Sequence, residues 1–150
     1  MIRRYWDSCA FLGWLKGEED KRAECQSVLE EAVSGKVEIV TSTLTLAEVL
    51  WLKKPPPAQK IAKEDRDKVR AVFESEWLVL YELDRRIAER AQDVVWDHDV
   101  QPKDAVHVAT ALSAEVDQLE TFDGGLLDRS GQIEGLKISR PMVDGKFQFS

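Results

Sequence analysis

Cysteine and histidine are both scarce in this sequence. The 150 residues include two of each. Two cysteines are too few for a disulfide framework, and Cys9 and Cys25 lack the paired spacing of a zinc site. We therefore expect free thiols in a reducing cytosol, and we expect no metal site built on sulfur.

Long hydrophobic runs are also missing. No apolar stretch reaches the length of about 20 residues that a helix needs to cross a bilayer. The start of the sequence, "MIRRYWDSCA", brings charged residues where a signal peptide would have an apolar segment. We expect a cytoplasmic protein without a membrane anchor.

A third absence is excess positive charge. The formal net charge is −7, which argues against a protein that coats nucleic acid through a broad basic surface. A nuclease is still compatible with this charge, because bound metal ions supply positive charge locally. Basic side chains are concentrated in residues 53–70, which hold seven basic and three acidic residues.

What is present indicates one globular domain over residues 1–150. The apolar fraction is 43% and there are five tryptophans, enough for a core of ordinary size. Short apolar runs predict strands at 2–6, 37–42, 77–83, 118–122 and 136–139. Helical patterns between them cover 8–16, 23–35, 44–54, 62–75, a segment after residue 84 and one after residue 103. The tail 143–150 has the pattern of a small hairpin.

Strands that alternate with helices need crossover connections, and these favour a parallel sheet. The predicted fold is therefore α/β, with four to five central parallel strands between two layers of helices. In such folds, ligands bind outside the carboxyl ends of the strands, near the point where the strand order reverses.

Four acidic residues are predicted to lie at that edge. Asp7 follows the first strand, Asp123 follows the fourth, Asp104 opens a helix and Glu48 lies one turn into another. Helix N-termini and strand C-termini share one edge of a parallel sheet, so the four carboxylates can converge.

Each acid also has a simpler explanation. Asp7 and Asp104 could cap their helices, and Asp123 with Gly124 and Gly125 suits a turn. Glu48 is harder to explain, because its helix is apolar nearly all round and burying an unpaired carboxylate is costly. Glu48 needs a partner.

A divalent metal ion would explain all four acids together. Clustered carboxylates raise one another's pKa unless a cation neutralises them. Carboxylates without cysteine or paired histidine suit hard ions, so the expected cofactor is Mg²⁺, with Mn²⁺ as a substitute.

The acids lie in motifs that together resemble a known family. The segments "RRYWDSCAFL", "TSTLTLAEVL", "KDAVHVATAL" and "LETFDGG" resemble, in order and spacing, the four acidic motifs of PIN-domain nucleases, above all the small VapC-type toxins. The resemblance runs from residue 3 to about residue 125. It implies a PIN-like three-layer α/β/α sandwich and a metal-dependent ribonuclease. It also implies a homodimer and inhibition by a small antitoxin protein.

The resemblance assigns roles residue by residue. It implies that Asp7, Glu48, Asp104 and Asp123 are the catalytic, metal-binding acids. Ser8 and Thr121 match the supporting hydroxyl residues of the family. Cys9 departs from the family's usual Asn or Ser. We consider Lys103, Lys53 and Lys54 as candidate RNA contacts.

Several other residues have two interpretations. His107 is three residues after Asp104, so it could orient a phosphate or be a partly buried histidine satisfied by a neighbour. His98 is expected in a loop. Trp14 and Trp51 could belong to the core or could face a dimer mate or an antitoxin helix.

Three other functions compete with a toxin ribonuclease. A catalytically silent PIN-like module that binds RNA or protein should have lost its acids, whereas this sequence has all four. An aspartyl-phosphate enzyme would need a second Asp two residues after Asp7, where Cys9 stands. A non-toxin PIN nuclease acting on other RNA or on DNA stays open.

Overall fold

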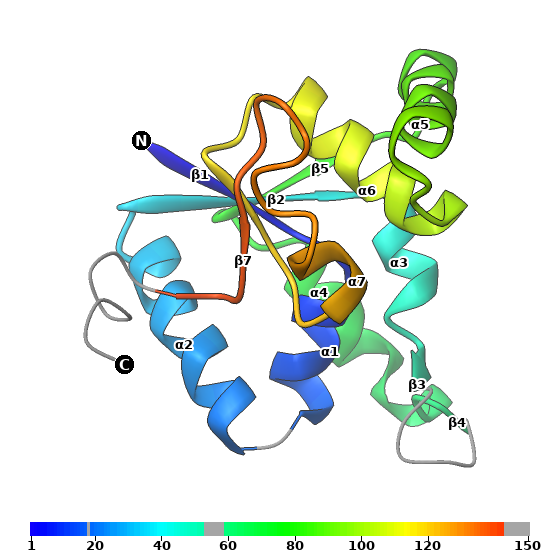
Figure 1. Ribbon diagram of the computed structural model, residues 1–150. Helices are drawn as coiled ribbons and strands as arrows, with labels where there is room; N and C mark the ends of the chain where they lie inside the picture. The colour runs from blue at the N-terminus through cyan, green and yellow to red at the C-terminus, as the bar shows by residue number, and fades with distance from the viewer. Residues whose placement is uncertain (18, 53–58, 143–150) are drawn as a thin grey trace.

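A sheet of five parallel strands forms the centre of the computed structural model (Figure 1). The structure describes residues 1–17, 19–52 and 59–142. The strands are β1 (Ile2–Trp6), β2 (Val37–Ser42), β5 (Leu78–Tyr81), β6 (Gln118–Glu120) and β7 (Ile138–Ser139), in the order β5-β2-β1-β6-β7. The chain extends the sheet from β1 to β5 on one side and then returns to add β6 and β7 on the other. The strand order therefore reverses at β1, which is where such folds bind ligands.

Helices cover both faces of this sheet. On one face, α1 (Ser8–Lys16), α2 (Glu19–Val33) and α4 (Arg66–Phe73) pack against Trp6 and Ile39. On the other, α5 (Arg85–His98), α6 (Pro102–Ser113) and α7 (Gly124–Leu127) pack against Tyr5 and Val40 (Figure 1). Successive strand residues point to opposite faces, which is why Tyr5 and Trp6 enter different cores. The predicted three-layer α/β/α sandwich is confirmed.

Aspartate caps and one left-handed residue set the ends of several helices. Asp84 precedes α5 and accepts a hydrogen bond from the N–H of Ile87, as expected of an N-cap. The same helix ends at Asp99, whose φ of 54° lies in the left-handed region. Pro102 then begins α6, in a position where a helix needs no N–H donor.

The helix predicted over 44–54 is wrong at its carboxyl end. α3 covers only Leu44–Glu48. The chain then enters β3 (Trp51–Leu52), which pairs antiparallel with β4 (Gln59–Lys60), and the N–H of Ile61 donates to the carbonyl of Leu50. Backbone groups that a longer helix would have used for its own hydrogen bonds pair instead with β4 and Ile61. The proline run at 55–57 lies outside the described residues.

Other differences from the prediction are smaller. The strands at 77–83, 118–122 and 136–139 are shorter than predicted, and the helix predicted over 62–75 begins as the 3₁₀ turn η1 (Lys63–Asp65). β5 is an edge strand with three half-buried residues, although a continuous apolar run such as that at 77–83 is typical of a strand covered on both faces. The hairpin predicted for 143–150 lies outside the described residues.

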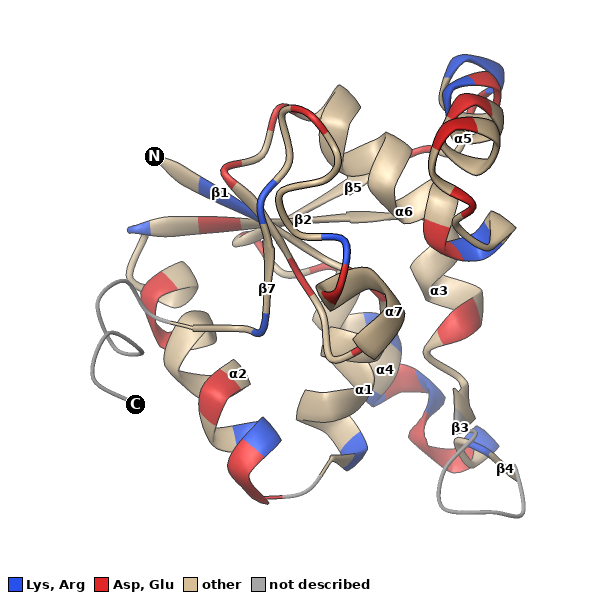
Figure 2. Cartoon of the chain, in the orientation of Figure 1, with Lys and Arg blue, Asp and Glu red and all other residues tan. Residues whose placement is uncertain are grey.

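Charged residues of both signs are distributed over the helices. Figure 2 shows acidic and basic residues mixed along α2 and α5, without a continuous basic face there. No helix in the described part of the chain is long and apolar enough to span a bilayer.

Candidate active site

Asp7 lies at the carboxyl end of β1, where the strand order reverses. Its side chain is 2% exposed and receives two hydrogen bonds. The N–H of Ala10 donates to Oδ1 at 2.9 Å, so Asp7 caps α1, and the hydroxyl of Thr121 donates to Oδ2 at 2.6 Å. The capping interpretation of Asp7 is therefore correct, but it leaves a buried carboxylate to be explained.

Burial raises the pKa of Asp7 to about 6, and the nearby carboxylate of Asp104 acts in the same direction. Opposing this, the electrostatic influence of His107 and the hydrogen bonds from Thr121 and Ala10 lower the pKa. A carboxyl group with a pKa this close to neutrality binds a proton or a cation readily.

Glu48 has a partner within the chain. Its Oε1 lies 2.6 Å from Nε2 of His107, and the other ring nitrogen, Nδ1, lies 2.7 Å from the hydroxyl of Tyr5. His107 is 1% exposed, while the side chain of Glu48 is 16% exposed. The interpretation of His107 as a histidine satisfied by a neighbour is confirmed, and that neighbour is one of the four acids.

Asp104 and Asp123 occupy the starts of two helices. Asp104 is half-buried in the first turn of α6, whose N-cap is Gln101, so Asp104 is not a helix cap. Asp123 does cap α7 and accepts from the N–H of Leu126 at 2.9 Å. The N–H of Asp123 donates to the Thr121 hydroxyl. Thr121 thus bridges Asp7 and Asp123 directly.

The Cys9 thiol lies within electrostatic reach of all four acids. Burial is the main reason that its pKa rises to about 12, and the charges of Asp7, Asp123, Asp104 and Glu48 each raise it further. The half-buried thiol therefore stays protonated at neutral pH. The charges of all four acids act on this thiol, and the convergence of their carboxylates on one metal site stays a prediction.

The remaining predicted site residues are less informative. Ser8 is the first residue of α1 and is half-buried, and Lys103 is exposed beside Asp104. Lys53 and Lys54 lie outside the described residues. His98 is the last residue of α5, not a loop residue.

Comparison of the sequence with models of protein families identifies the family of this chain. The model described as "PIN domain" matches residues 4–131. The chain belongs to the PIN-domain family. Both the family and the fold implied by the motifs are thereby confirmed.

Solved structures share this PIN fold at low sequence identity. A toxin–antitoxin complex from Klebsiella pneumoniae aligns at 20% identity with a TM-score of 0.61, covering 89% of this chain and 94% of the other. VapC20 of Mycobacterium tuberculosis, a toxin that cleaves the sarcin–ricin loop, aligns at 14% identity with a TM-score of 0.59, covering 81% and 90%. No curated protein matches this PIN domain.

The carboxylate oxygens of the proposed PIN site are suitable ligands for a hard divalent ion, but the described residues do not form a compact set of ligands. Within residues 1–17, 19–52 and 59–142, no three Asp, Glu, His or Cys residues lie close enough together to hold a metal ion. Mg²⁺ is usually bound through only one or two carboxylates and keeps several waters. The residues present therefore fit magnesium better than an ion that needs a dense set of protein ligands.

Sequence reasoning missed a second buried carboxylate in this PIN domain. Glu120 is fully buried and pairs with Arg4, whose Nη1 lies 2.5 Å from its Oε2. Trp6 donates its indole N–H to Oε1 at 2.8 Å, and Gln118 also hydrogen-bonds the carboxylate. A signal was available: Arg4 and Glu120 are charged residues of opposite sign inside two predicted strands.

Proposed function

We propose that this PIN domain is a Mg²⁺- or Mn²⁺-dependent endoribonuclease that hydrolyses RNA phosphodiester bonds. Asp7, Glu48, Asp104 and Asp123 are proposed as its catalytic, metal-binding acids. The observation that supports this most is the burial of Asp7 at the carboxyl end of β1, where its pKa is raised and where the charges of all four acids also raise the pKa of Cys9. Such a concentration of negative charge destabilises the protein unless a cation offsets it.

The chain's own residues would divide the work as follows. Asp7 and Asp104, which interact electrostatically, would hold the ion, with Glu48 and Asp123 at the rim. A bound ion would offset the charge of these carboxylates and of the phosphate under attack. The hydroxyl of Thr121 donates a hydrogen bond to Asp7 and so orients it, and the exposed Lys103 is proposed to contact an RNA phosphate.

We also propose that the protein is the toxin of a toxin–antitoxin pair and acts in the cytoplasm. The two similar structures support this role, since one is a toxin–antitoxin complex and the other is a toxin that cleaves an RNA loop. A small antitoxin is the expected partner. The retained acids favour this function over a silent binding module.

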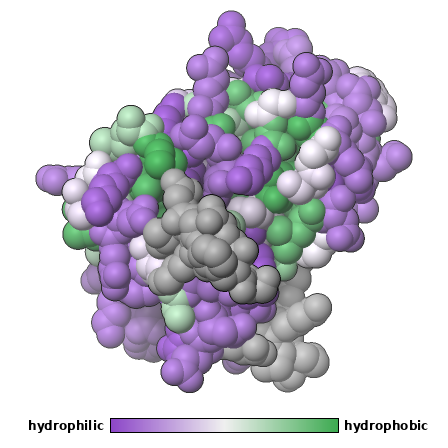
Figure 3. Space-filling view, turned by 60° about the vertical axis from the view of Figure 1, so that its left-hand side comes forward, coloured by the Kyte–Doolittle hydropathy of each residue, from purple (hydrophilic) through white to green (hydrophobic). Residues whose placement is uncertain are grey.

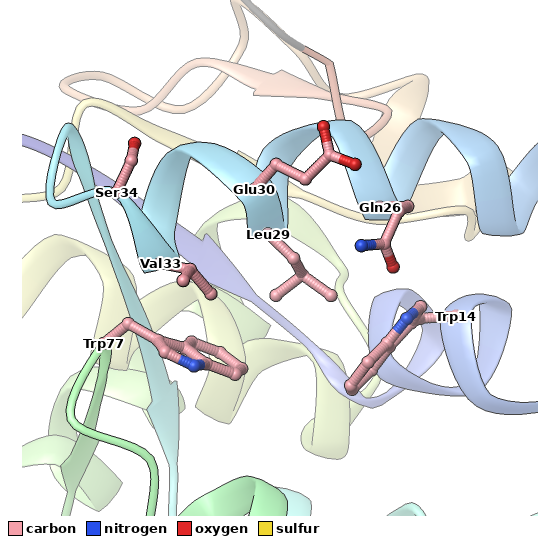
Figure 4. A pocket seen from close by; sticks show the side chains of 7 residues that line it. All are labelled: Trp14, Gln26, Leu29, Glu30, Val33, Ser34 and Trp77. Carbon is pink, nitrogen blue, oxygen red and sulfur yellow. The ribbon is translucent and has the colours of Figure 1, made fainter.

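A homodimer is part of the same proposal, and exposed hydrophobic residues support partner binding. Trp96 on α5 is 73% exposed and Trp51 is 49% exposed. A groove of about 370 Å³ lies between α1 and α2, where Trp14 and Trp77 flank Leu29 (Figure 4). On the face shown in Figure 3, hydrophobic patches are separated by hydrophilic residues. Light scattering should give a dimer mass, and a monomer at micromolar concentration would contradict this part of the proposal.

The proposal is tested by removing single carboxylates. Asp7→Asn and Asp104→Asn should each lower Mg²⁺-dependent cleavage of RNA by more than about 100-fold, because even outer-shell changes at metal sites cost 10- to 100-fold. Asp93→Asn, at an exposed position of α5, is the matched control and should cleave normally. Undiminished cleavage by either site variant would show that the acids are wrongly assigned.

Toxicity is tested separately in growing bacteria. Expression of the wild-type chain without an antitoxin should arrest growth, and expression of Asp104→Asn should not. Harmless overproduction of an active nuclease would indicate a non-toxin PIN nuclease.

A further inference from the structure

We propose that His107, supported by Tyr5, is a positioning residue that fixes the carboxylate of Glu48 in the site. Its role in cleavage rests on the proposed function, whereas its contact with Glu48 does not. The three residues come from β1, α3 and α6 and form one hydrogen-bonded series from Tyr5 through His107 to Glu48. The two contacts join residues that lie 102 and 59 positions apart in the chain.

The chemistry of the end groups fixes the direction of these hydrogen bonds. An ionised carboxylate only accepts, so Nε2 of His107 must donate to Glu48. A phenol is protonated at neutral pH, so the Tyr5 hydroxyl can donate to Nδ1. Tyr5 thereby selects the ring tautomer that carries its hydrogen on Nε2, facing Glu48.

Glu48 needs such support because its own helix holds it weakly. α3 is only five residues long, its N-cap Thr43 makes no side-chain capping bond, and Glu48 is its last residue. Residues 49 and 50 then lead into the small β3–β4 hairpin. Without a side-chain contact, the Glu48 carboxylate would be free to turn toward solvent and away from the other acids.

α6, by contrast, is held in place by buried side chains and can therefore fix the position of His107. Ala105, Val108 and Ala109 on this helix are each 0% exposed, and α5 and α6 pack closely together. His107 follows Asp104 by three residues and is therefore about one turn away along the helix. α6 thus contributes one acid directly and holds a second through His107.

A matched pair of substitutions tests the proposal. His107→Gln keeps an N–H donor near the place of Nε2, and His107→Met has a similar volume without a donor. We expect His107→Met to weaken both Mn²⁺ binding and RNA cleavage by about 10- to 100-fold, as outer-shell changes at metal sites do. His107→Gln should stay within about tenfold of the wild type. Retained activity in Gln, which cannot shuttle protons as histidine does, would separate positioning from acid–base catalysis. Tyr5→Phe should cost about 3- to 10-fold, the loss of one neutral hydrogen bond.

A double-substitution cycle identifies the route of the effect. If His107 acts through Glu48, adding His107→Met to Glu48→Gln should cause little further loss of Mn²⁺ affinity. Mn²⁺ binding is followed by calorimetry without RNA, and folding by thermal unfolding. Wild-type Mn²⁺ affinity in His107→Met, or fully additive losses in the double variant, would overturn the proposal. If His107→Met does not fold, the comparison of Tyr5→Phe with wild type decides.

These measurements keep the two proposals apart. A wild-type protein that binds Mn²⁺ but leaves RNA intact would contradict the proposed function, while the binding data would still test His107. A wild-type protein that cleaves RNA together with an unaffected His107→Met variant would contradict only the role of His107.

Discussion

Among the described residues, the carboxylates of Asp7 and Glu120 are buried, and their surroundings differ sharply. Glu120 lies on β6 beside Trp6 of β1, and Asp7 is the next residue after Trp6. Burial raises the pKa of both groups. Glu120 is held by the guanidinium of Arg4, an indole N–H and an amide. Asp7 accepts hydrogen bonds from one hydroxyl and one backbone N–H, and the negative charge of Asp104 raises its pKa further.

We interpret Glu120 as a structural carboxylate and Asp7 as a ligand of the proposed metal site. The charge of Glu120 is balanced inside the protein, and its partners leave little capacity for a ligand. Asp7 lies among an excess of negative charge, and an added cation would relieve this excess. A buried acid alone is therefore a poor indicator of a site, whereas a buried acid beside other acids is a good one.

The largest effect on stability is expected at Glu120. Glu120→Gln should lower the free energy of unfolding by about 3–5 kcal/mol, because it leaves the buried charge of Arg4 without its counter-ion. Urea denaturation measures this loss. The double variant Arg4→Met/Glu120→Leu should lose much less, since replacing both partners of a buried pair is often nearly neutral. A mild effect of Glu120→Gln would mean that the two carboxylates differ less than the contacts indicate.

Asp7 should respond in the opposite direction. Asp7→Asn keeps a capping side chain but removes the buried charge, so without divalent metal it should be more stable than wild type above pH 7. The ordinary pKa of 3.8 rises to about 6 in the folded protein, which corresponds to a difference of about 3 kcal/mol.

The pH dependence follows from the sign of this shift. The folded protein binds the Asp7 proton more tightly than the unfolded chain does. The stability that this proton provides is complete below about pH 4 and is lost as the pH rises through about 6. Urea denaturation in EDTA should therefore show the advantage of Asp7→Asn appearing between these pH values. Adding Mg²⁺ should reduce the advantage at pH 8, and an advantage that ignores both pH and metal would contradict the assignment.

The smallest effect is expected at Thr121, whose hydroxyl joins Asp7 to Asp123. Thr121→Val should cost about 1–3 kcal/mol, the usual range for a hydrogen bond to a charged group. Thr121→Ser keeps the hydroxyl and serves as the matched control. Chemical denaturation checks the stability, and RNA cleavage should fall further in Val than in Ser. Equal behaviour of the two variants would show that the methyl group matters more than the hydroxyl.

Much of the fold could be predicted from local sequence patterns. The boundaries predicted for β1, β2 and α1 agree with the structure, because β-branched runs and an aspartate cap act over a few residues. The sequence also placed Asp7 directly after β1 and Asp104 in the first turn of α6 correctly, whereas the convergence of the four acids stays a prediction. The early end of α3 could not be predicted, because it depends on pairing between β3 and β4 across residues 53–58.

The contacts that distinguish Asp7 from Glu120 could not be predicted from the sequence, for a different reason. Arg4 and Glu120 are 116 positions apart, and Tyr5 and His107 are 102 apart. Periodicity predicts which face of an element a side chain occupies, but it does not say which distant side chain meets it. His107 was therefore identified as a candidate without its connection to Glu48.

The position of β1 in the sheet also bears on how the protein is made. β1 is translated first, yet one of its two neighbours, β6, is among the last strands to be synthesised. A chain still emerging from the ribosome has neither Asp123 nor the strand that brings it next to Asp7. Under the proposed function, an incomplete copy of this PIN domain should therefore have no nuclease activity.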